Sequence, residues 1–150
     1  MASGLYGSIH IPRPALKIDF NRWVGFPYRD LGRGPDVYDC WGLVVAVYET
    51  VGIRLPSYSD EYVTAEDRDA IAALISGKLS PWREIEERDV RPLDGVLVNM
   101  AGYERHIGIV VKRGYMLHTG FGIVESRIER YDALHLKKRV SRFMRHEALT

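Results

Sequence analysis

The stretch of sequence that decides the fold is residues 38–51, which read YDCWGLVVAVYETV. Apolar or aromatic side chains stand at positions 40, 43, 44, 47, 48 and 51, which is the spacing of one helix face. The four valines favour a strand by propensity. Twelve residues with this period, followed by Gly52, instead predict a helix from Cys40 to Val51. Asp36 or Asp39 is the expected N-terminal cap.

Cys40 is the only cysteine of the chain, and this helix would place it in the first turn. There, unpaired backbone N–H groups and the positive end of the helix dipole favour a thiolate and are able to stabilise an oxyanion. Gly42 leaves room for another backbone segment to approach closely. A lone cysteine on an apolar helix face is more often part of the packing than a nucleophile, so both interpretations stay open.

The composition is that of an ordinary globular domain. Of the 150 residues, 46% are hydrophobic and 27% are charged, which excludes the disordered, collagen and coiled-coil classes. The net charge of +1 is too small for strong binding to phosphates, so we expect no nucleic-acid partner. One cysteine excludes an internal disulfide and a cysteine-only metal site. No apolar run approaches the ~20 residues of a membrane span, so we expect no membrane insertion.

The order of patterns predicts one α+β domain over residues 18–150, preceded by a flexible arm at 1–17. Residues 18–24 are expected to form a short helix or turn. We interpret 53–93 as an inserted helical segment, with a helix at about 65–76 ended by Gly77. Alternating residues from Asp94 onward predict strands at 96–100, 107–111, 115–119 and 122–126.

Residues 127–146 contain seven basic and two acidic side chains. This excess of positive charge is consistent with contact with an anionic surface or a partner. The alternative is a basic edge strand whose charges oppose aggregation, and this is the simpler interpretation.

A cysteine nucleophile needs a base, usually a histidine held by a third polar group. His106 and His118 lie twelve residues apart on two predicted strands joined by a turn that contains Gly114. A two-residue loop would send the histidines to opposite faces of the hairpin. A three-residue loop with Gly114 as a bulge would place His118 opposite Gly108, with His106 diagonal to it on the same face. Taken singly, each histidine is more often a surface or packing residue.

These segments together resemble the NlpC/P60 family of papain-like cell-wall peptidases. Residues 39–44 resemble its Asp-Cys-Ser-Gly-Leu-Val motif, and residues 25–28 its Gly-Thr-Pro-Tyr segment. Residues 106–110 resemble the His-Val-Gly-Ile-Tyr strand and 117–119 the Ile-His-Ala segment, with the histidine spacing preserved. Residues 29–32, Arg-Asp-Leu-Gly, depart from the usual Trp-Gly-Gly and leave the shape of the substrate pocket open.

The resemblance implies a papain-like α+β fold, with the helix of Cys40 packed on a central antiparallel sheet. It implies hydrolysis of an amide in the peptidoglycan stem peptide, typically between γ-D-glutamate and diaminopimelate, without metal or cofactor. Cys40 would attack, His106 would act as base and then acid, and His118 would orient His106. Tyr28, Asp39 and Trp41 are the implied substrate-binding residues, with the Tyr28 hydroxyl supporting the oxyanion.

The similarity is greatest to the branch found in phage tails and gene transfer agents, which carries tryptophan where cellular members carry serine. Residues 55–58, Leu-Pro-Ser-Tyr, also resemble that branch. No secretory signal is visible at residues 1–20. We therefore expect a particle protein made in the bacterial cytoplasm, located at the tail tip beside other tail-tip or baseplate proteins, and acting on the periplasmic cell wall.

Two other functions remain to be weighed against the peptidase. The first is a structural tail-tip or hub component that keeps the fold with little or no activity. The second is an acyltransferase or amidase of related fold that acts on lipids or other amides. The joint presence of Cys40, His106 and His118 favours the peptidase. The absence of an identifiable membrane-inserting amphipathic helix ranks the acyltransferase last.

Overall fold

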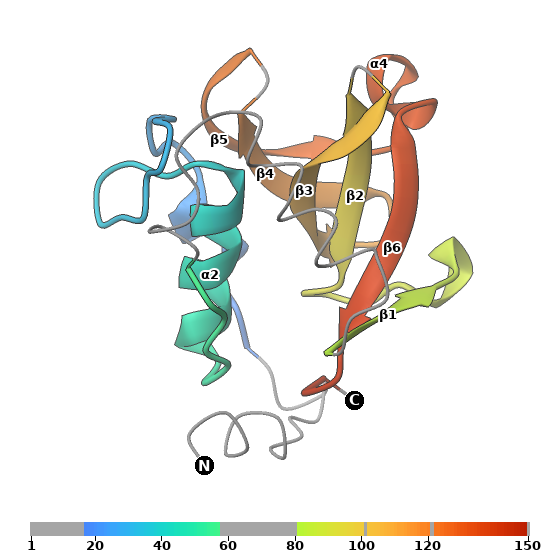
Figure 1. Ribbon diagram of the computed structural model, residues 1–150, viewed down its shortest axis with the longest axis horizontal. Helices are drawn as coiled ribbons and strands as arrows, with labels where there is room; N and C mark the ends of the chain where they lie inside the picture. The colour runs from blue at the N-terminus through green and yellow to red at the C-terminus, as the bar shows by residue number, and fades with distance from the viewer. Residues whose placement is uncertain (1–16, 58–80, 101, 121, 150) are drawn as a thin grey trace.

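The computed structural model describes residues 17–57, 81–100, 102–120 and 122–149 (Figure 1). The described elements are a six-stranded antiparallel sheet, the helix α2 and short helical turns. In chain order they are η2 (Phe20–Trp23), α2 (Cys40–Thr50), β1 (Trp82–Ile85), η4 (Glu87–Asp89), β2 (Gly95–Met100), β3 (Tyr103–Lys112), β4 (Tyr115–Gly120), β5 (Ile123–Arg130), α4 (Leu134–Lys137) and β6 (Val140–His146).

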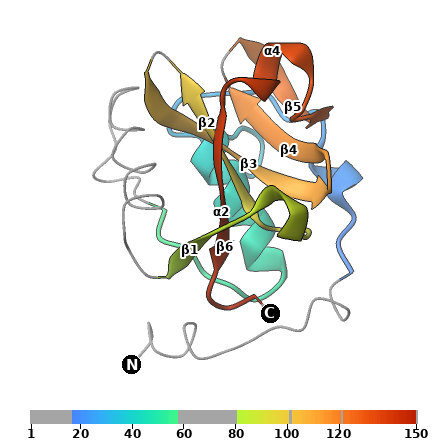
Figure 2. The same cartoon turned by 90° about the vertical axis from the view of Figure 1, so that its right-hand side faces the viewer.

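The strand order in the sheet is β1-β6-β2-β3-β4-β5, and every neighbouring pair is antiparallel. The helix α2 packs across β3 and β4, and in Figure 2 it lies behind the strands. The expected α+β fold, with the cysteine helix on an antiparallel sheet, is confirmed. Among the described residues, no helix has the length and apolar character that crossing a membrane requires.

The helix predicted for residues 40–51 is confirmed and begins at Cys40, as its spacing indicated. Asp39 is the cap, and its side chain accepts the backbone N–H of Gly42 at 2.7 Å. Gly52 follows Val51 with φ +84°, a left-handed conformation that suits glycine just past a helix end. The short helix predicted at 18–24 is also present, as the 3-10 turn η2.

Each face of the sheet buries its own apolar cluster, because alternate strand residues point to opposite sides. One face meets α2, and its core includes Leu97, Ile109 and Leu117. The other face is covered by the chain around α4 and includes Val96, Val110 and Met116, with Tyr131, Leu136 and Phe143. The sheet is therefore buried on both sides near its centre.

Two predictions made from charge and composition need correction. The stretch interpreted as a helical insertion at 53–93 contains a strand, since Trp82–Ile85 pairs with β6. Of the basic segment 127–146, residues 127–130 belong to β5, the last strand of the order, but β6 is not an edge strand, since it lies between β1 and β2. Ion pairs explain how β6 tolerates its charges there: Arg142 contacts Glu104 at 2.8 Å and Arg145 contacts Asp94 at 2.8 Å. The helix predicted at 65–76 and most of the arm at 1–17 lie outside the described residues.

His146 closes the sheet against α2 in an aromatic cluster. Its ring meets Trp82 edge-to-face, with 5.1 Å between ring centroids, and Tyr48 of the helix at 6.0 Å. Its Nδ1 accepts the backbone N–H of Ala148 at 3.0 Å. Because the side chain is buried, the pKa of His146 is lowered from 6.5 to about 4.

This buried imidazole predicts a loss of stability in mild acid. Between pH 6.5 and 4, His146 binds a proton in the unfolded chain but not in the folded chain. The free energy of unfolding therefore falls as the pH falls. The contribution approaches about 1.4 kcal/mol per pH unit. In His146→Asn the Oδ1 still accepts from Ala148 but does not titrate. Urea unfolding at pH 7, 6 and 5 should show a less stable variant with a shallower acid loss, whereas parallel curves would contradict the role of His146.

Candidate active site

The start of α2 is built around the carboxylate of Asp39. Its Oδ1 accepts both the N–H of Gly42 and Nη1 of Arg33, the latter at 2.6 Å. The same guanidinium donates from Nε and Nη2 to the carbonyl of Ser57, at 3.0 and 2.8 Å. Asp39 is fully buried. Its side chain therefore joins three chain segments, and the predicted contact of Asp39 with substrate stays a prediction.

Gly42 marks the place where a loop crosses the beginning of the helix. A Cβ added to Gly42 would lie 2.0 Å from the carbonyl oxygen of Gly32. The same carbonyl accepts the N–H of Asp39 at 3.2 Å. The close backbone approach expected at Gly42 is confirmed, and any larger residue there would push the loop away from the nucleophile.

Trp41 turns inward at the side of the helix start. Its side chain is almost fully buried, and Nε1 donates to the carbonyl of Pro56 at 2.8 Å. This hydrogen bond attaches the segment around Pro56, which follows α2, to the start of the helix. Trp41 is 1% exposed, and its predicted contact with substrate stays a prediction.

The thiol of Cys40 lies against β3. The backbone N–H groups of Ile107 and Trp41 point at the sulfur and lower its pKa, but they are outweighed. Burial, and after it the negative charge of Asp39, raise the pKa of Cys40 to about 12. The N–H of Trp41 at the helix start thus favours the thiolate as expected, but burial and the charge of Asp39 favour the neutral thiol by more. The thiol is neutral at pH 7, and attack requires a base to remove its proton.

The hairpin that carries the histidines has the two-residue turn, with Lys112 paired to Tyr115 and Gly114 at φ +93°. By itself this pairing sends His106 and His118 to opposite faces, so the three-residue loop is wrong.

A bulge at Val111 corrects the register beyond the turn. The ladder shifts between Val110 and Lys112, so that Val110 pairs with Met116. One extra residue on β3 reverses the faces of everything that follows. His118 then lies opposite Gly108, whose missing Cβ would stand 3.2 Å from the Cβ of His118. The predicted arrangement of the two histidines is reached by a bulge in place of a longer loop.

The two imidazoles are in direct contact. Nε2 of His106 lies 2.7 Å from Nδ1 of His118, and both rings are buried. Nε2 of His118 lies 2.7 Å from Oε1 of Glu129 on β5. Burial lowers the pKa of His118, while the hydrogen bond and charge of Glu129 oppose this effect. The Cys40 thiol lies against the backbone of Ile107, which follows His106 on β3. The catalytic roles of Cys40, His106 and His118 stay predictions.

Glu129 was not identified from the sequence. Its Oε2 also meets Nε2 of the exposed His135, at 2.7 Å. The register places Arg127 opposite His118 and Glu129 opposite Met116, so Glu129 is the diagonal neighbour of His118. Strand alternation on 123–130 would have placed it on the histidine face, but only the pairing of β4 with β5 shows which residue it meets.

Tyr28 stands beside the histidines. The Cβ position of Gly120 lies 3.4 Å from the Tyr28 ring and 3.9 Å from the ring of His106. The Tyr28 hydroxyl donates to Oδ1 of Asp30 at 2.6 Å. The predicted oxyanion role of this hydroxyl stays a prediction, because its proton is directed to Asp30 here.

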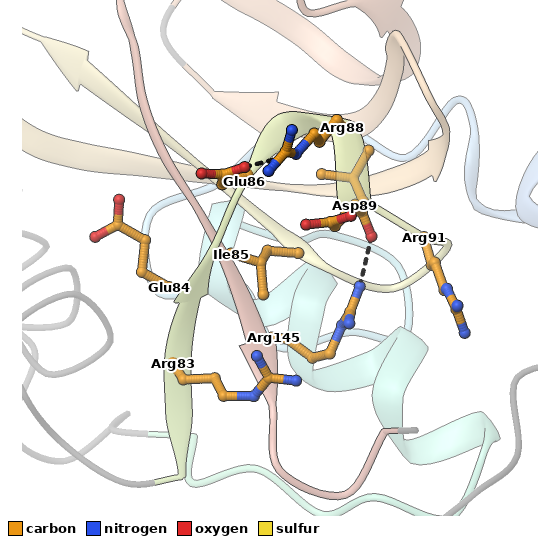
Figure 3. A pocket seen from close by; sticks show the side chains of 9 residues that line it. Arg83, Glu84, Ile85, Glu86, Arg88, Asp89, Arg91 and Arg145 are labelled. Carbon is orange, nitrogen blue, oxygen red and sulfur yellow. Dashed lines mark hydrogen bonds and ion pairs between the residues drawn. The ribbon is translucent and has the colours of Figure 1, made fainter.

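Two pockets differ in their relation to these residues. The smaller, of about 160 Å³, is lined by His106, His118, Glu129 and His135 among others. The larger, of about 470 Å³, lies between β1, η4 and Arg145 of β6, at the β1 end of the strand order (Figure 3). Within its wall Arg88 pairs with Glu86 at 2.7 Å. The smaller pocket holds both histidines of the site, whereas Cys40 is not among its lining residues.

Comparison with known proteins agrees with this geometry. The model of the NlpC/P60 family matches residues 25–145, and the chain belongs to that family. NlpC1 from Trichomonas vaginalis is 21% identical, with a TM-score of 0.61 over 84% of this chain and 41% of the other. An NlpC/P60 family protein from Bacillus cereus is 15% identical, with a TM-score of 0.64 over 84% and 37%. No curated protein gives a significant match.

One further similar structure has nearly the same extent. The NlpC/P60 domain of the peptidoglycan hydrolase SagA is 16% identical, with a TM-score of 0.55 over 83% of this chain and 91% of that domain. By contrast, the chain spans about two fifths of the Trichomonas and Bacillus proteins. The papain-like fold of the family is therefore shared by this chain.

The neutral thiol gives a spectroscopic prediction. Since burial and Asp39 raise the pKa of Cys40 to about 12, its thiolate absorbance near 240 nm should be missing at neutral pH. The measurement is the difference in absorbance between the wild type and Cys40→Ser across a pH titration, which cancels the tyrosines. Appearance of the thiolate below about pH 8 would instead indicate a thiolate–imidazolium pair with His106.

Proposed function

We propose that the protein is a cysteine endopeptidase that hydrolyses an amide bond of the peptidoglycan stem peptide, between γ-D-glutamate and diaminopimelate. Members of the NlpC/P60 family are in general cysteine peptidases of the cell wall, which supports the class of reaction. The observation that carries the proposal is the 2.7 Å contact of His106 with His118, on the strand against which the Cys40 thiol lies. These are the nucleophile, the base and the group that orients the base.

The reaction begins with proton transfer from the Cys40 thiol to Nδ1 of His106, the ring nitrogen that does not face His118. The sulfur attacks the amide carbonyl carbon, and the electrons of the C=O bond move to oxygen. The backbone N–H of Cys40 at the start of α2 stabilises this oxyanion, since the N–H groups of Gly42 and Leu43 donate to Asp39. Because the resting thiol is neutral, this transfer is required before attack.

The tetrahedral intermediate collapses by breaking the C–N bond. The leaving nitrogen takes the proton from His106, and a thioester to Cys40 remains. His106 then removes a proton from water, the hydroxide attacks the thioester, and the returning proton restores the thiol. The net result is a new carboxylate and a new amine, with no metal or cofactor taking part.

We place this activity at the tip of a phage tail or gene-transfer-agent particle, where it opens the cell wall during entry. Support comes from Trp41 in the position next to the nucleophile and from the sequence of residues 55–58. The carbonyls of Pro56 and Ser57 accept hydrogen bonds from Trp41 and Arg33. The chain would be made in the cytoplasm, carried by other tail-tip or baseplate proteins, and would act in the periplasm.

A structural tail-tip component is the second candidate, and one observation favours it. Cys40 is only 5% exposed, and its pKa is raised by that burial. A protein that kept the fold for assembly alone would show this closed arrangement. Cleavage by the purified protein separates the two functions.

The first test is digestion of diaminopimelate-type muropeptides by the wild type beside Cys40→Ala. We expect a new amine and carboxylate pair in the mass spectrum from the wild type only, with at least a ~10⁴-fold loss in the variant, because the nucleophile is gone. Cys40→Ser, which keeps the size of the residue, serves as the folding control. No product from folded wild type would favour the structural role.

The two histidines should differ in their effects. His106→Ala removes the base, so kcat should fall by about 10³–10⁴-fold. His118→Ala leaves the base but frees its orientation, and a loss of about 10²-fold is expected. Steady-state kinetics on one muropeptide compare them, with circular dichroism confirming that both variants are folded. An equal or larger loss in His118→Ala would reverse the assignment.

A further inference from the structure

The ring of His118 has a polar partner at each nitrogen, and its contact with Glu129 determines how it can bond to His106. Its Nδ1 faces His106 and its Nε2 faces Oε1 of Glu129, each at 2.7 Å. The other oxygen of Glu129 meets Nε2 of His135. A continuous chain of four side chains therefore runs from the buried site to the surface, where the His135 side chain is 63% exposed.

Hydrogen positions follow from the charge of the carboxylate at the middle of this chain. Burial raises the pKa of Glu129, but the hydrogen bonds from His118 and His135 lower it by more, so the carboxylate is ionised at neutral pH. An ionised carboxylate only accepts hydrogen bonds. His118 must then carry its proton on Nε2, and neutral His118 offers a lone pair at Nδ1.

The tautomer of His118 in turn determines the tautomer of His106. A lone pair at Nδ1 of His118 requires a proton on Nε2 of His106, because two acceptors 2.7 Å apart would repel. Neutral His106 then has its lone pair at Nδ1, which is the form able to take a proton from a thiol. The tautomer of the base thus depends on a residue that does not touch it.

We propose that Glu129 is a positioning residue that selects the basic tautomer of His106 through His118. The inference rests on the proposed function for its catalytic meaning, but the tautomers exist whether or not the substrate is peptidoglycan. Three groups face Glu129 at hydrogen-bonding distance: His118 from β4, His135 from α4 and Arg127 of its own strand, whose Nε lies 3.3 Å from Oε1. Arg139 lines the same pocket.

The alternative is that Glu129 only ties α4 to the sheet through His135. His135→Ala tests this, since it removes that tie and leaves the contact with His118 in place. Glu125→Gln is the matched control on the same strand, because Glu125 is exposed and lies outside the chain of histidines.

The test is nitrogen-15 NMR of the histidine side chains in the full chain, for wild type, Glu129→Gln, His135→Ala and Glu125→Gln. We expect protons on Nε2 of both His106 and His118 in the wild type and in both control variants. Glu129→Gln replaces the obligate acceptor by an amide that also donates, so His118 should populate both tautomers. A wild-type proton on Nδ1 of either ring would overturn the proposal, even if Glu129→Gln failed to fold.

Kinetics on muropeptides provide the second readout. For Glu129→Gln we expect kcat to fall about 10-fold or more with KM unchanged, because the residue acts through His118 and not on substrate. Loss of the negative charge should also move the acid limb of the pH profile to lower pH, since the carboxylate stabilises protonated histidine.

Unchanged tautomers and an unchanged kcat in Glu129→Gln, or an equal loss of kcat in His135→Ala, would contradict the proposal. A folded wild type without peptidase activity would contradict the proposed function. The NMR measurement would still decide whether Glu129 selects the tautomer of His106.

Discussion

Two donors from different parts of the chain converge on one oxygen of the Asp39 carboxylate. The N–H of Gly42 fixes where α2 begins, and Arg33 brings in the loop before the helix and the Ser57 carbonyl after it. A buried carboxylate is tolerated only when it is paired in this way. The position of the Cys40 thiol depends on this pairing. Asp39 is also a reason why the thiol is neutral, since its charge opposes ionisation.

The sheet supplies the other half of the site through one irregularity. A single extra residue at Val111 turns His118 to the face of His106, and the pairing of β4 with β5 then presents Glu129 to His118. The capped start of α2 thus positions Cys40, whereas the bulged hairpin and its pairing with β5 position His106, His118 and Glu129. The Cys40 thiol lies against the backbone N–H of Ile107, the residue that follows His106 on β3, where α2 packs on that strand.

Local patterns predicted much of the fold, and their failures have a common physical cause. The helix at Cys40, its end at Gly52 and the strands from Asp94 onward were predictable, because periodicity and turn residues act over short distances. The strand at Trp82–Ile85 and the central place of β6 were missed, because strand pairing joins residues some sixty positions apart and ion pairs such as Arg145 with Asp94 neutralise what looks like an exposed basic strand.

The sequence by itself determined the family and the identity of the predicted nucleophile and histidines, because these rest on residue types at short, countable spacings. Only the tertiary structure decided three things: the ionisation of Cys40, the inward direction of Trp41 and the contact of Glu129 with His118. Each depends on burial or on a neighbour from another strand or loop. Desolvation and hydrogen bonding are properties of the packed chain, so no spacing along the sequence carries them.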